Sequence, residues 1–388
     1  RRESDLQLGS VAANRYLLLV QDPPWRDGEL HHRHERVRLA TTDEYLVVDQ
    51  ELLLQEIPEK PAAYHIRAGI GVTEDTRRQH VGDEIHLRGL LEISSYCVRS
   101  CLYCGLRASN AALPRYRMTS EEILGCAAQA AALGYGTVVL QAGESEAFGV
   151  EEIAALVRRI KAETPLAVTL GLGERPPEDW AAWKAAGADR YLLRHETSDT
   201  ALLRRLRPAH RYPSRIDALR VLLSLGYETG SGIMVGLPGQ SYASIAEDIM
   251  LFADLDLDMI GVGPYIPHPA TPLAGAASEL GAEQAPATET MAIKGVALAR
   301  LVCPQANIPA TTAVATINRV DGRESALLAG ANVVMPNLTP ARYRRLYEIY
   351  PEKACDHETA EHGGEAIKAR IRALGRAIGT GPGARVRR

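Results

Sequence analysis

Short apolar runs alternate with amphipathic stretches in a regular order from Gly82 onward. The apolar runs predict eight strands, near residues 85–93, 136–141, 166–172, 189–194, 229–235, 258–263, 307–313 and 331–335. The amphipathic stretches predict helices, near residues 119–133, 149–163, 177–186, 213–225, 240–255, 285–302 and 322–329. Eight strands that alternate with helices indicate parallel βα units, and eight is the number that closes a barrel. We therefore expect an α/β fold of the TIM-type (β/α)8 barrel class.

An open, doubly wound sheet is the competing architecture. A GxGxxG turn after the first strand would favour it, but cysteines occupy that position. Helix starts are marked by Thr119-Ser120-Glu121-Glu122 and by Pro177-Glu178-Asp179, which carry capping and acidic first-turn signals. Helix ends are marked by glycines at positions that favour a left-handed residue: Gly134, Gly187, Gly226 and Gly330. These local signals agree with the expected order of strands and helices.

The pattern divides the chain into three segments. Residues 1–80 lack a regular pattern and predict an irregular N-terminal extension, which includes the cluster His31-His32-Arg33-His34. We expect that cluster to be a solvated loop, with adventitious metal binding as the alternative. Residues 81–351 predict the barrel, and residues 352–388 predict a short C-terminal helical tail. Its Gly- and Arg-rich end, from Gly379 to Arg388, is expected to be disordered.

Composition and charge narrow the class of protein further. A net charge of −4 provides no basic field, so nucleic acid is not an expected partner. No apolar stretch approaches the ~20 residues of a membrane span, and we expect no secretory leader. Six cysteines are too few for a disulfide framework in 388 residues. Clustered thiols instead favour metal binding in a reducing compartment, so we expect a cytoplasmic protein without a membrane partner.

Three cysteines follow the first predicted strand with the spacing Cys-x3-Cys-x2-Cys: Cys97, Cys101 and Cys104. Structural zinc usually requires four closed ligands, and no fourth cysteine or histidine stands nearby. Three thiolates on one loop could hold three irons of a 4Fe–4S cluster and leave the fourth without a protein ligand. Three buried, incidental thiols are the alternative. The open iron would make this loop a catalytic site.

Other polar residues follow predicted strands at the barrel end that carries active sites. Glu144 follows the second strand, and Arg194-His195-Glu196 follows the fourth. Each has a structural alternative: a solvated charge for Glu144, a salt bridge for Arg194. For His195 a hydrogen-bonded core position is favoured over a catalytic base.

The cysteine spacing, with Tyr103 before the third cysteine, resembles that of the radical S-adenosylmethionine (SAM) superfamily. Further segments are similar to the HydE family of iron-only hydrogenase maturases and run in order from about residue 81 to 351. They include Tyr116-Arg117-Met118-Thr119, Arg190-Tyr191-Leu192-Leu193-Arg194-His195-Glu196-Thr197, Met234-Val235-Gly236-Leu237-Pro238-Gly239-Gln240 and Asn307-Ile308-Pro309-Ala310-Thr311-Thr312-Ala313. The related methylornithine synthase and biotin synthase families match fewer of these segments.

The resemblance implies two cofactors, one 4Fe–4S cluster and SAM, and assigns residues to them. Cys97, Cys101 and Cys104 would hold the cluster and act as the catalytic ligands. Tyr103, Glu144, Glu196 and Arg215 would belong to the SAM site, where carboxylates suit an ammonium group and a guanidinium suits a carboxylate. Thr169, Arg194, Met259, Thr311, Thr312 and Tyr347 match positions that line the family's substrate cavity.

The function implied is reductive cleavage of SAM to a 5′-deoxyadenosyl radical, which acts on a cysteine-bound iron carbonyl/cyanide precursor in [FeFe]-hydrogenase cofactor assembly. The alternative is a radical amino-acid mutase of the methylornithine synthase type, and a more distant one is an iron–sulfur carrier. Expected partners are a small anionic organometallic or amino-acid-like substrate, a low-potential electron donor and a maturation scaffold protein.

Two departures from the HydE pattern concern the ends of the chain. Many family members bind a second cluster near the C-terminus, where this chain has only Cys355, and Gly363, Gly364 and Ala366 cannot act as ligands. We therefore expect a single cluster. The first 80 residues do not align with the family. Cys126 lies in a helical pattern and Cys303 at the end of one, and both are expected to be buried structural thiols.

Overall fold

The structure, a computed structural model, describes residues 36–41, 44–49, 63–208, 211–212, 214–278, 284–354 and 360–385. Six parallel strands pair with one another in chain order: β3 (Glu84–Ser94), β4 (Thr137–Ala142), β5 (Ala167–Gly171), β6 (Arg190–Leu192), β7 (Glu228–Val235) and β8 (Met259–Pro264). The ring is closed by residues 307–310 and by β9 (Val333–Val334). Met259 bridges Asn307, Pro309 bridges Val333, and β9 pairs with β3. The expected (β/α)8 barrel is confirmed.

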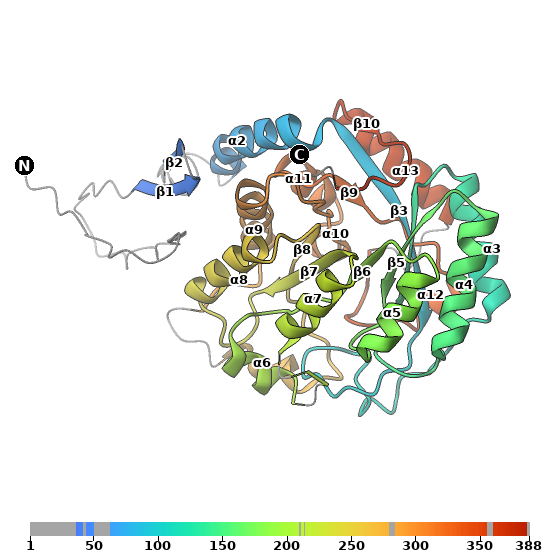
Figure 1. The fold of residues 1–388 in the computed structure, drawn as a ribbon. Helices are drawn as coiled ribbons and strands as arrows, with labels where there is room; N and C mark the ends of the chain where they lie inside the picture. The colour runs from blue at the N-terminus through green and yellow to red at the C-terminus, as the bar shows by residue number, and fades with distance from the viewer. Residues whose placement is uncertain are drawn as a thin grey trace, which may run out of the picture.

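Helices surround this ring (Figure 1). Those on the barrel itself are α3 (Ser120–Ala132), α4 (Val150–Glu163), α5 (Pro177–Ala185), α6 (Thr200–Leu206), α7 (Arg215–Ser224), α8 (Tyr242–Asp254), α9 (Glu289–Val302), α10 (Thr312–Ile317) and α11 (Gly322–Leu328). The 3-10 helix η1 (Pro272–Ser278) and α12 (Ala341–Arg344) lie in connections. The predicted capping box of α3 is present, because Thr119 and Glu122 exchange their side-chain and backbone hydrogen bonds. The four predicted left-handed glycines all have positive φ.

The seventh predicted strand, 307–313, is shorter than expected. Its backbone pairs with both neighbours only over residues 307–310, through isolated bridges and hydrogen bonds such as that from the Ala310 N–H to the Val333 carbonyl, 2.9 Å. Pro309 has no N–H to donate to a neighbouring strand. Thr311 then accepts a hydrogen bond from the N–H of Val314 and begins α10. The end of the predicted strand is therefore a helix.

The expectation of an irregular N-terminal extension is wrong in part. Strands β1 (Arg36–Thr41) and β2 (Glu44–Asp49) pair antiparallel, and α2 (Ala63–Val81) is a helix of 19 residues. The guanidinium of Arg77, at the end of α2, is fully buried and forms ion pairs with Glu74 (2.9 Å) and Asp83 (2.8 Å). Ion pairs rather than an apolar stripe hold this end of the helix, so apolar periodicity did not predict it.

The expectation of a disordered C-terminal end is also wrong for residues 379–385. The predicted helix is α13 (Ala360–Ala373), after which β10 (Ala377–Ile378) pairs in parallel with the start of β3. The following residues continue beneath the barrel, where the N–H of Gly379 bonds to the carbonyl of Ile85 at 2.9 Å. In Figure 1 the C-terminus lies at this end of the barrel, and the loops after β3 lie at the opposite end, at the lower edge of the view.

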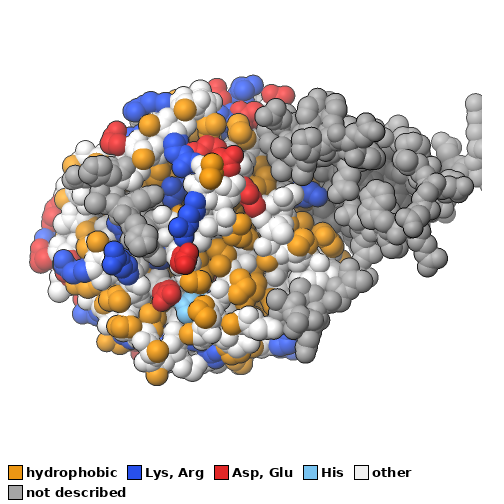
Figure 2. All heavy atoms as spheres, turned by 180° about the vertical axis from the view of Figure 1, so that it is seen from behind, with side chains coloured by type: hydrophobic (Ala, Val, Ile, Leu, Met, Phe, Trp, Pro, Cys, Tyr) orange, Lys and Arg blue, Asp and Glu red, His pale blue; other side chains and the backbone are white. Residues whose placement is uncertain are grey.

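The surface carries no broad field of one charge on the face seen in Figure 2, where Lys and Arg side chains alternate with Asp and Glu. Apolar side chains gather in the lower half of that face. Within the described residues, no helix is both long enough and apolar enough to cross a bilayer.

His86 lies at the N-terminal end of the barrel and should make the free energy of unfolding depend on pH. Burial, together with the charges of Arg88 and Arg190, lowers the pKa of His86 to about 4. Between about pH 6.5 and 4 the unfolded chain binds a proton at this site and the folded chain does not. Acidification through this window therefore lowers the free energy of unfolding, by about 2 kcal/mol from this residue. Chemical denaturation of the wild type and of His86→Asn at pH 7 and pH 4.5 measures it. Equal losses in both proteins would contradict the assignment.

Candidate active site

The cysteine loop follows β3 and is tied to three other segments of the barrel. The N–H of Val98 bonds to the Glu144 carbonyl (2.8 Å), that of Leu102 to Leu206 (2.9 Å), and that of Gly105 to Ile349 (3.0 Å). Cys97, Cys101 and Cys104 all line one cavity of about 200 Å³ at the C-terminal ends of the strands. The structure thus brings the three predicted cluster ligands together.

The thiols in this cavity suit a metal cluster. Burial raises the pKa of the Cys97 thiol and, more strongly, that of Cys104, so these thiols are protonated until a metal stabilises the thiolate. Among the described residues, no three potential ligands lie close enough together to bind one metal ion. A cubane does not need that arrangement, because each of its thiolates binds a different iron.

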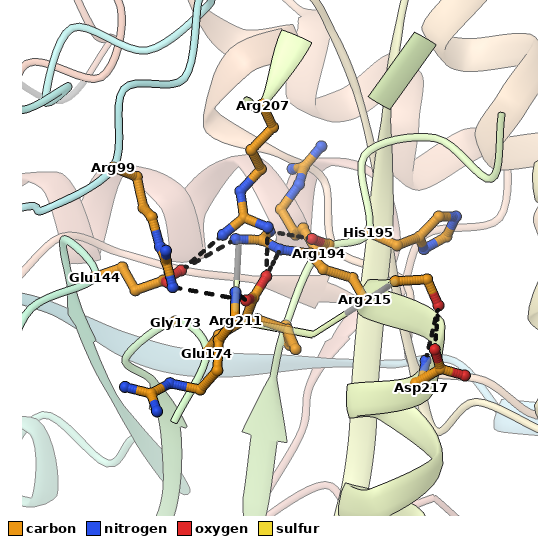
Figure 3. A network of polar contacts seen from close by, with 12 residues as sticks. Arg99, Glu144, Gly173, Glu174, Arg194, His195, Arg207, Arg211, Arg215 and Asp217 are labelled. Carbon is orange, nitrogen blue, oxygen red and sulfur yellow. Dashed lines mark hydrogen bonds and ion pairs between the residues drawn. The ribbon is translucent and has the colours of Figure 1, made fainter. Parts of the chain in front are cut away.

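Two buried carboxylates, Glu144 and Glu174, share three arginines (Figure 3). Glu144 follows β4 and pairs with Arg99 of the cysteine loop, with Arg207 (3.0 Å) and with Arg215 (3.3 Å). Glu174 follows β5 and pairs with Arg207 and with Arg215 (3.0 Å). We call these five residues the carboxylate–arginine network. It has three guanidinium groups for two carboxylates, so one positive charge is in excess.

The network fixes the charge of Glu174. Burial alone would raise the pKa of this carboxyl, but Arg207 and Arg215 outweigh it and lower the pKa to about 2. The backbone N–H of Arg211 adds a hydrogen bond of 2.7 Å. Glu174 is therefore ionised at every pH at which the protein is handled.

Glu196 reaches the same cavity through an unusual backbone conformation. Its φ of 69° lies in the left-handed region, which non-glycine residues rarely occupy. Its carboxylate accepts a hydrogen bond from the Nε of Arg194 (3.1 Å) and lines the cavity. Such strained residues cluster at functional sites.

His195 faces away from this cavity (Figure 3). Its Nδ1 lies 2.8 Å from the hydroxyl of Ser231, and its Nε2 lies 3.5 Å from Asp248, with the ring fully buried against Phe252. The interpretation of His195 as a hydrogen-bonded core residue is confirmed.

A second cavity, of about 70 Å³, lies deeper in the barrel, and Arg194 lines both cavities. Three further predicted substrate residues line it: Thr169, Met259 and Thr311. Thr312 begins α10 and lines neither cavity, and Tyr347 lines the cysteine cavity, where its hydroxyl accepts a hydrogen bond from Gln141 (3.2 Å). Tyr103 and Arg215 also line the cysteine cavity.

Comparison with known proteins agrees with this geometry. The family model for the radical SAM superfamily matches residues 91–252. The [FeFe] hydrogenase maturase subunit HydE of Thermotoga maritima is 46% identical over 316 residues, which cover 81% of this chain and 88% of that protein. The chain belongs to the HydE family of radical SAM enzymes.

More distant relatives match about two thirds of the chain. The 3-methylornithine synthase of Methanosarcina barkeri is 28% identical over 266 residues, 68% of this chain and 72% of the relative. Biotin synthase of Thermus thermophilus is 29% identical over 272 residues, 69% and 79% respectively. A crystal structure of methylornithine synthase superposes with a TM-score of 0.71 at 24% identity and covers 85% of this chain and 92% of that one. That likeness shows the fold.

Membership of the radical SAM superfamily implies a 4Fe–4S cluster and SAM, and the residues of this HydE family member fit both. Three thiols line one cavity, and two carboxylates and three guanidinium groups line it with them. Glu144 offers roughly four acceptor positions on its two oxygens, and the three arginines occupy three of them. One position is left for an ammonium group such as that of SAM.

Sequence reasoning missed two arginines that line these cavities, Arg88 and Arg99, and two further members of the carboxylate–arginine network, Glu174 and Arg207. A signal for Glu174 was present, because Gly173-Glu174 follows β5 much as Gly143-Glu144 follows β4. Arg88 interrupts the apolar alternation of β3, which marks it as facing a polar interior. Arg99 and Arg207 lie in loops and carried no comparable signal.

A side chain at Gly173 should weaken the binding of SAM. A Cβ at this position would lie 2.3 Å from Cγ of Glu144, and its φ of +78° disfavours any side chain. Gly173→Ala should cost about 1–2 kcal/mol of stability and displace Glu144, weakening SAM binding by about tenfold. The matched control is Gly171→Ala on the same β5 edge, where the nearest atom is 3.8 Å away. Spectroscopic titration of the iron-loaded variants with SAM measures the effect. Equal affinities would contradict it.

The buried ion pairs of Glu174 should contribute strongly to the stability of the fold. Glu174→Gln leaves two buried guanidinium groups short of a carboxylate, so the free energy of unfolding should fall by about 3 kcal/mol. The control is Glu146→Gln, because the Glu146 side chain is 82% exposed and its ion pair with Arg211 is long, at 3.8 Å. That change should alter stability by less than about 0.5 kcal/mol. Denaturant unfolding of both variants decides the matter, and a similar small effect at both positions would exclude a supporting role for the network.

Proposed function

We propose that this HydE family member cleaves SAM reductively and acts on a cysteine-bound iron carbonyl/cyanide precursor in assembly of the [FeFe]-hydrogenase cofactor. The observation that carries the proposal is the charge of the deeper cavity. Of the described residues that line it, two are arginines, Arg88 and Arg194, and none is a carboxylate. The name and 46% identity of the Thermotoga maritima relative support the same reading.

Arg88 is a buried cation, and the acidic side chain that influences it, Glu228, is already paired with Arg190 at 2.7 Å. No carboxylate of the described part of the chain forms an ion pair with it, and its Nη1 points to the sulfur of Met259 at 2.9 Å. Burial and the nearby Arg190 lower the pKa of Arg88 to about 9, so it is still charged at neutral pH. An anionic ligand in this cavity would supply the missing counter-charge. Carboxylate and cyanide groups both meet this requirement.

The cysteine cavity would hold the cofactors, and the deeper cavity would hold the substrate. A bound cluster would supply the low-potential electron for reductive cleavage of SAM. Cys97, Cys101 and Cys104 would hold the cluster, and Glu144, Glu196 and Arg215 would orient the charged groups of SAM. Arg194 borders both cavities, so its guanidinium can hold an anionic substrate next to the SAM site.

A lysine mutase would need a different deep cavity. Lysine carries an ammonium group at each end, and the distant one needs a buried carboxylate partner. The described residues that line the deep cavity provide none, which favours the maturase proposal. We also infer one cluster per chain, because outside the cysteine loop the sequence holds three scattered cysteines: Cys126, Cys303 and Cys355. Cys355 lies outside the described residues.

The partners follow from this chemistry. A low-potential electron donor would reduce the cluster, and a maturation scaffold protein would receive the product.

Incubation with two substrates tests the function. Reduced, iron-loaded enzyme with SAM should convert a cysteine-bound iron carbonyl/cyanide complex and should leave L-lysine unchanged, as followed by mass spectrometry. Arg194→Gln should raise KM for the complex at least about tenfold, and by more than it raises the Kd of SAM, which it affects only through the hydrogen bond from Arg194 to Glu196. Formation of methylornithine from lysine would overturn the proposal.

The control for Arg194 is Arg205→Gln, because Arg205 lies exposed on α6 and, among the described residues, its side chain bonds to the carbonyl of Pro238 alone, at 2.8 Å. It should leave both KM and SAM affinity unchanged. Iron analysis of the same preparations should give about four irons per chain if one 4Fe–4S cluster is bound.

A further inference from the structure

The residues that follow β10, Gly379–Arg385, cross the N-terminal end of the barrel, opposite the cysteine loop. We call this segment the C-terminal tail. It enters beside β3, since Ala377 pairs with Glu84 and Ile378 with Ile85, and the Gly379 N–H continues that ladder. It therefore begins as an extra strand and then turns beneath the ring.

Two carbonyl groups of the tail bind side chains from four parts of the ring. The carbonyl of Pro382 accepts hydrogen bonds from Thr137 of β4 (3.0 Å) and Arg190 of β6 (3.1 Å). The carbonyl of Gly383 accepts hydrogen bonds from Arg88 of β3 (3.1 Å) and Asn307 of the closing segment (3.1 Å). Buried polar side chains on opposite sides of the barrel are thus satisfied by one short stretch of backbone.

The tail also lies so close to the barrel that two contact positions leave no room for a side chain. A Cβ on Gly136 would lie 1.5 Å from the carbonyl oxygen of Gly381, and a Cβ on Gly383 would lie 2.5 Å from the ring of His86. Beyond these glycines, Arg385 fastens the end of the tail. Its guanidinium bonds to the carbonyls of Asp256 (2.8 Å) and Leu257 (3.2 Å) and lies 3.5 Å from the carboxylate of Asp258. The segment is held at both ends.

The tail reaches the deep cavity through two of its partners. Arg88 and Asn307 both line that cavity, and the Gly383 carbonyl binds both from below. Hydrogen bonds to Gly383 and to the Met259 sulfur fix the two Nη atoms of Arg88. The Nε of Arg88 is buried with no partner among the described residues. The orientation of this cation therefore depends on the tail.

We propose that the C-terminal tail is the floor of the substrate cavity. It closes the N-terminal end of the barrel to water and holds Arg88 in the direction from which it meets the substrate, a role that rests on the function proposed above. A radical intermediate requires a cavity closed to solvent, and a barrel with an internal cavity needs a plug that a filled barrel does not.

A thiol placed in the cavity tests the floor directly. In the background of Thr169→Cys, chains that end at Ile378 and at Arg385 are compared, both iron-loaded and with SAM bound. Loss of the tail should speed modification of the new thiol by iodoacetamide about tenfold, as measured by peptide mass spectrometry. The chain ending at Arg385 should match the full chain. Equal rates in the two truncated chains would overturn the proposal.

A milder variant covers the case in which the shorter chain does not fold. Arg385→Gln removes the bonds of the guanidinium to residues 256–258 and keeps the other contacts of the tail. Amide hydrogens at residues 84–88 and 137–139 should then exchange faster, while those of α4 stay unchanged. Unchanged exchange at the barrel end would contradict the floor. Neither measurement involves turnover, so either result is independent of whether the iron precursor is the true substrate.

Discussion

Charge neutralisation in a buried space governs the arrangement at the mouth of this barrel. Glu144 and Glu174 are nearly inaccessible to solvent, and so are their partners Arg207 and Arg215. A charge left alone in such surroundings costs several kcal/mol, so each member requires the others. The members come from the cysteine loop, from the ends of β4 and β5, and from the segments around α6 and α7. One set of ion pairs therefore positions both the cysteine loop and the carboxylates that we assign to the cluster and to SAM.

The barrel can be predicted from the sequence because the spacing of apolar residues shows which side of each strand or helix is buried. The cluster ligands can be predicted because three cysteines with this spacing have few other uses. Glu144 and Glu196 follow from their positions at strand ends. Glu174 has a similar position and was still missed, since only the fold shows which arginines surround it. Arg207 and Arg99 belong to loops, where residue type alone does not separate a solvated charge from a buried one.

The ends of the chain were predicted less well, for a related reason. The tail is held by its backbone carbonyls, and a hydrogen-bonded carbonyl leaves no trace in the identity of its residue. A glycine-rich, arginine-rich stretch therefore reads as disorder, although here the glycines permit close approach and Arg385 serves as a clamp. The end of α2 depends on the ion pairs of Arg77. Apolar periodicity reports neither kind of contact.

The position of the tail in the chain has a consequence for assembly. Every strand of the ring precedes it in sequence, so the ring must be synthesised before its lower end can be closed. Until then Arg88, Arg190, Thr137 and Asn307 lack their carbonyl partners, and water can reach the interior from below. During synthesis from the N-terminus the ring is therefore complete before the tail emerges, and the floor that we propose for the cavity would be added last.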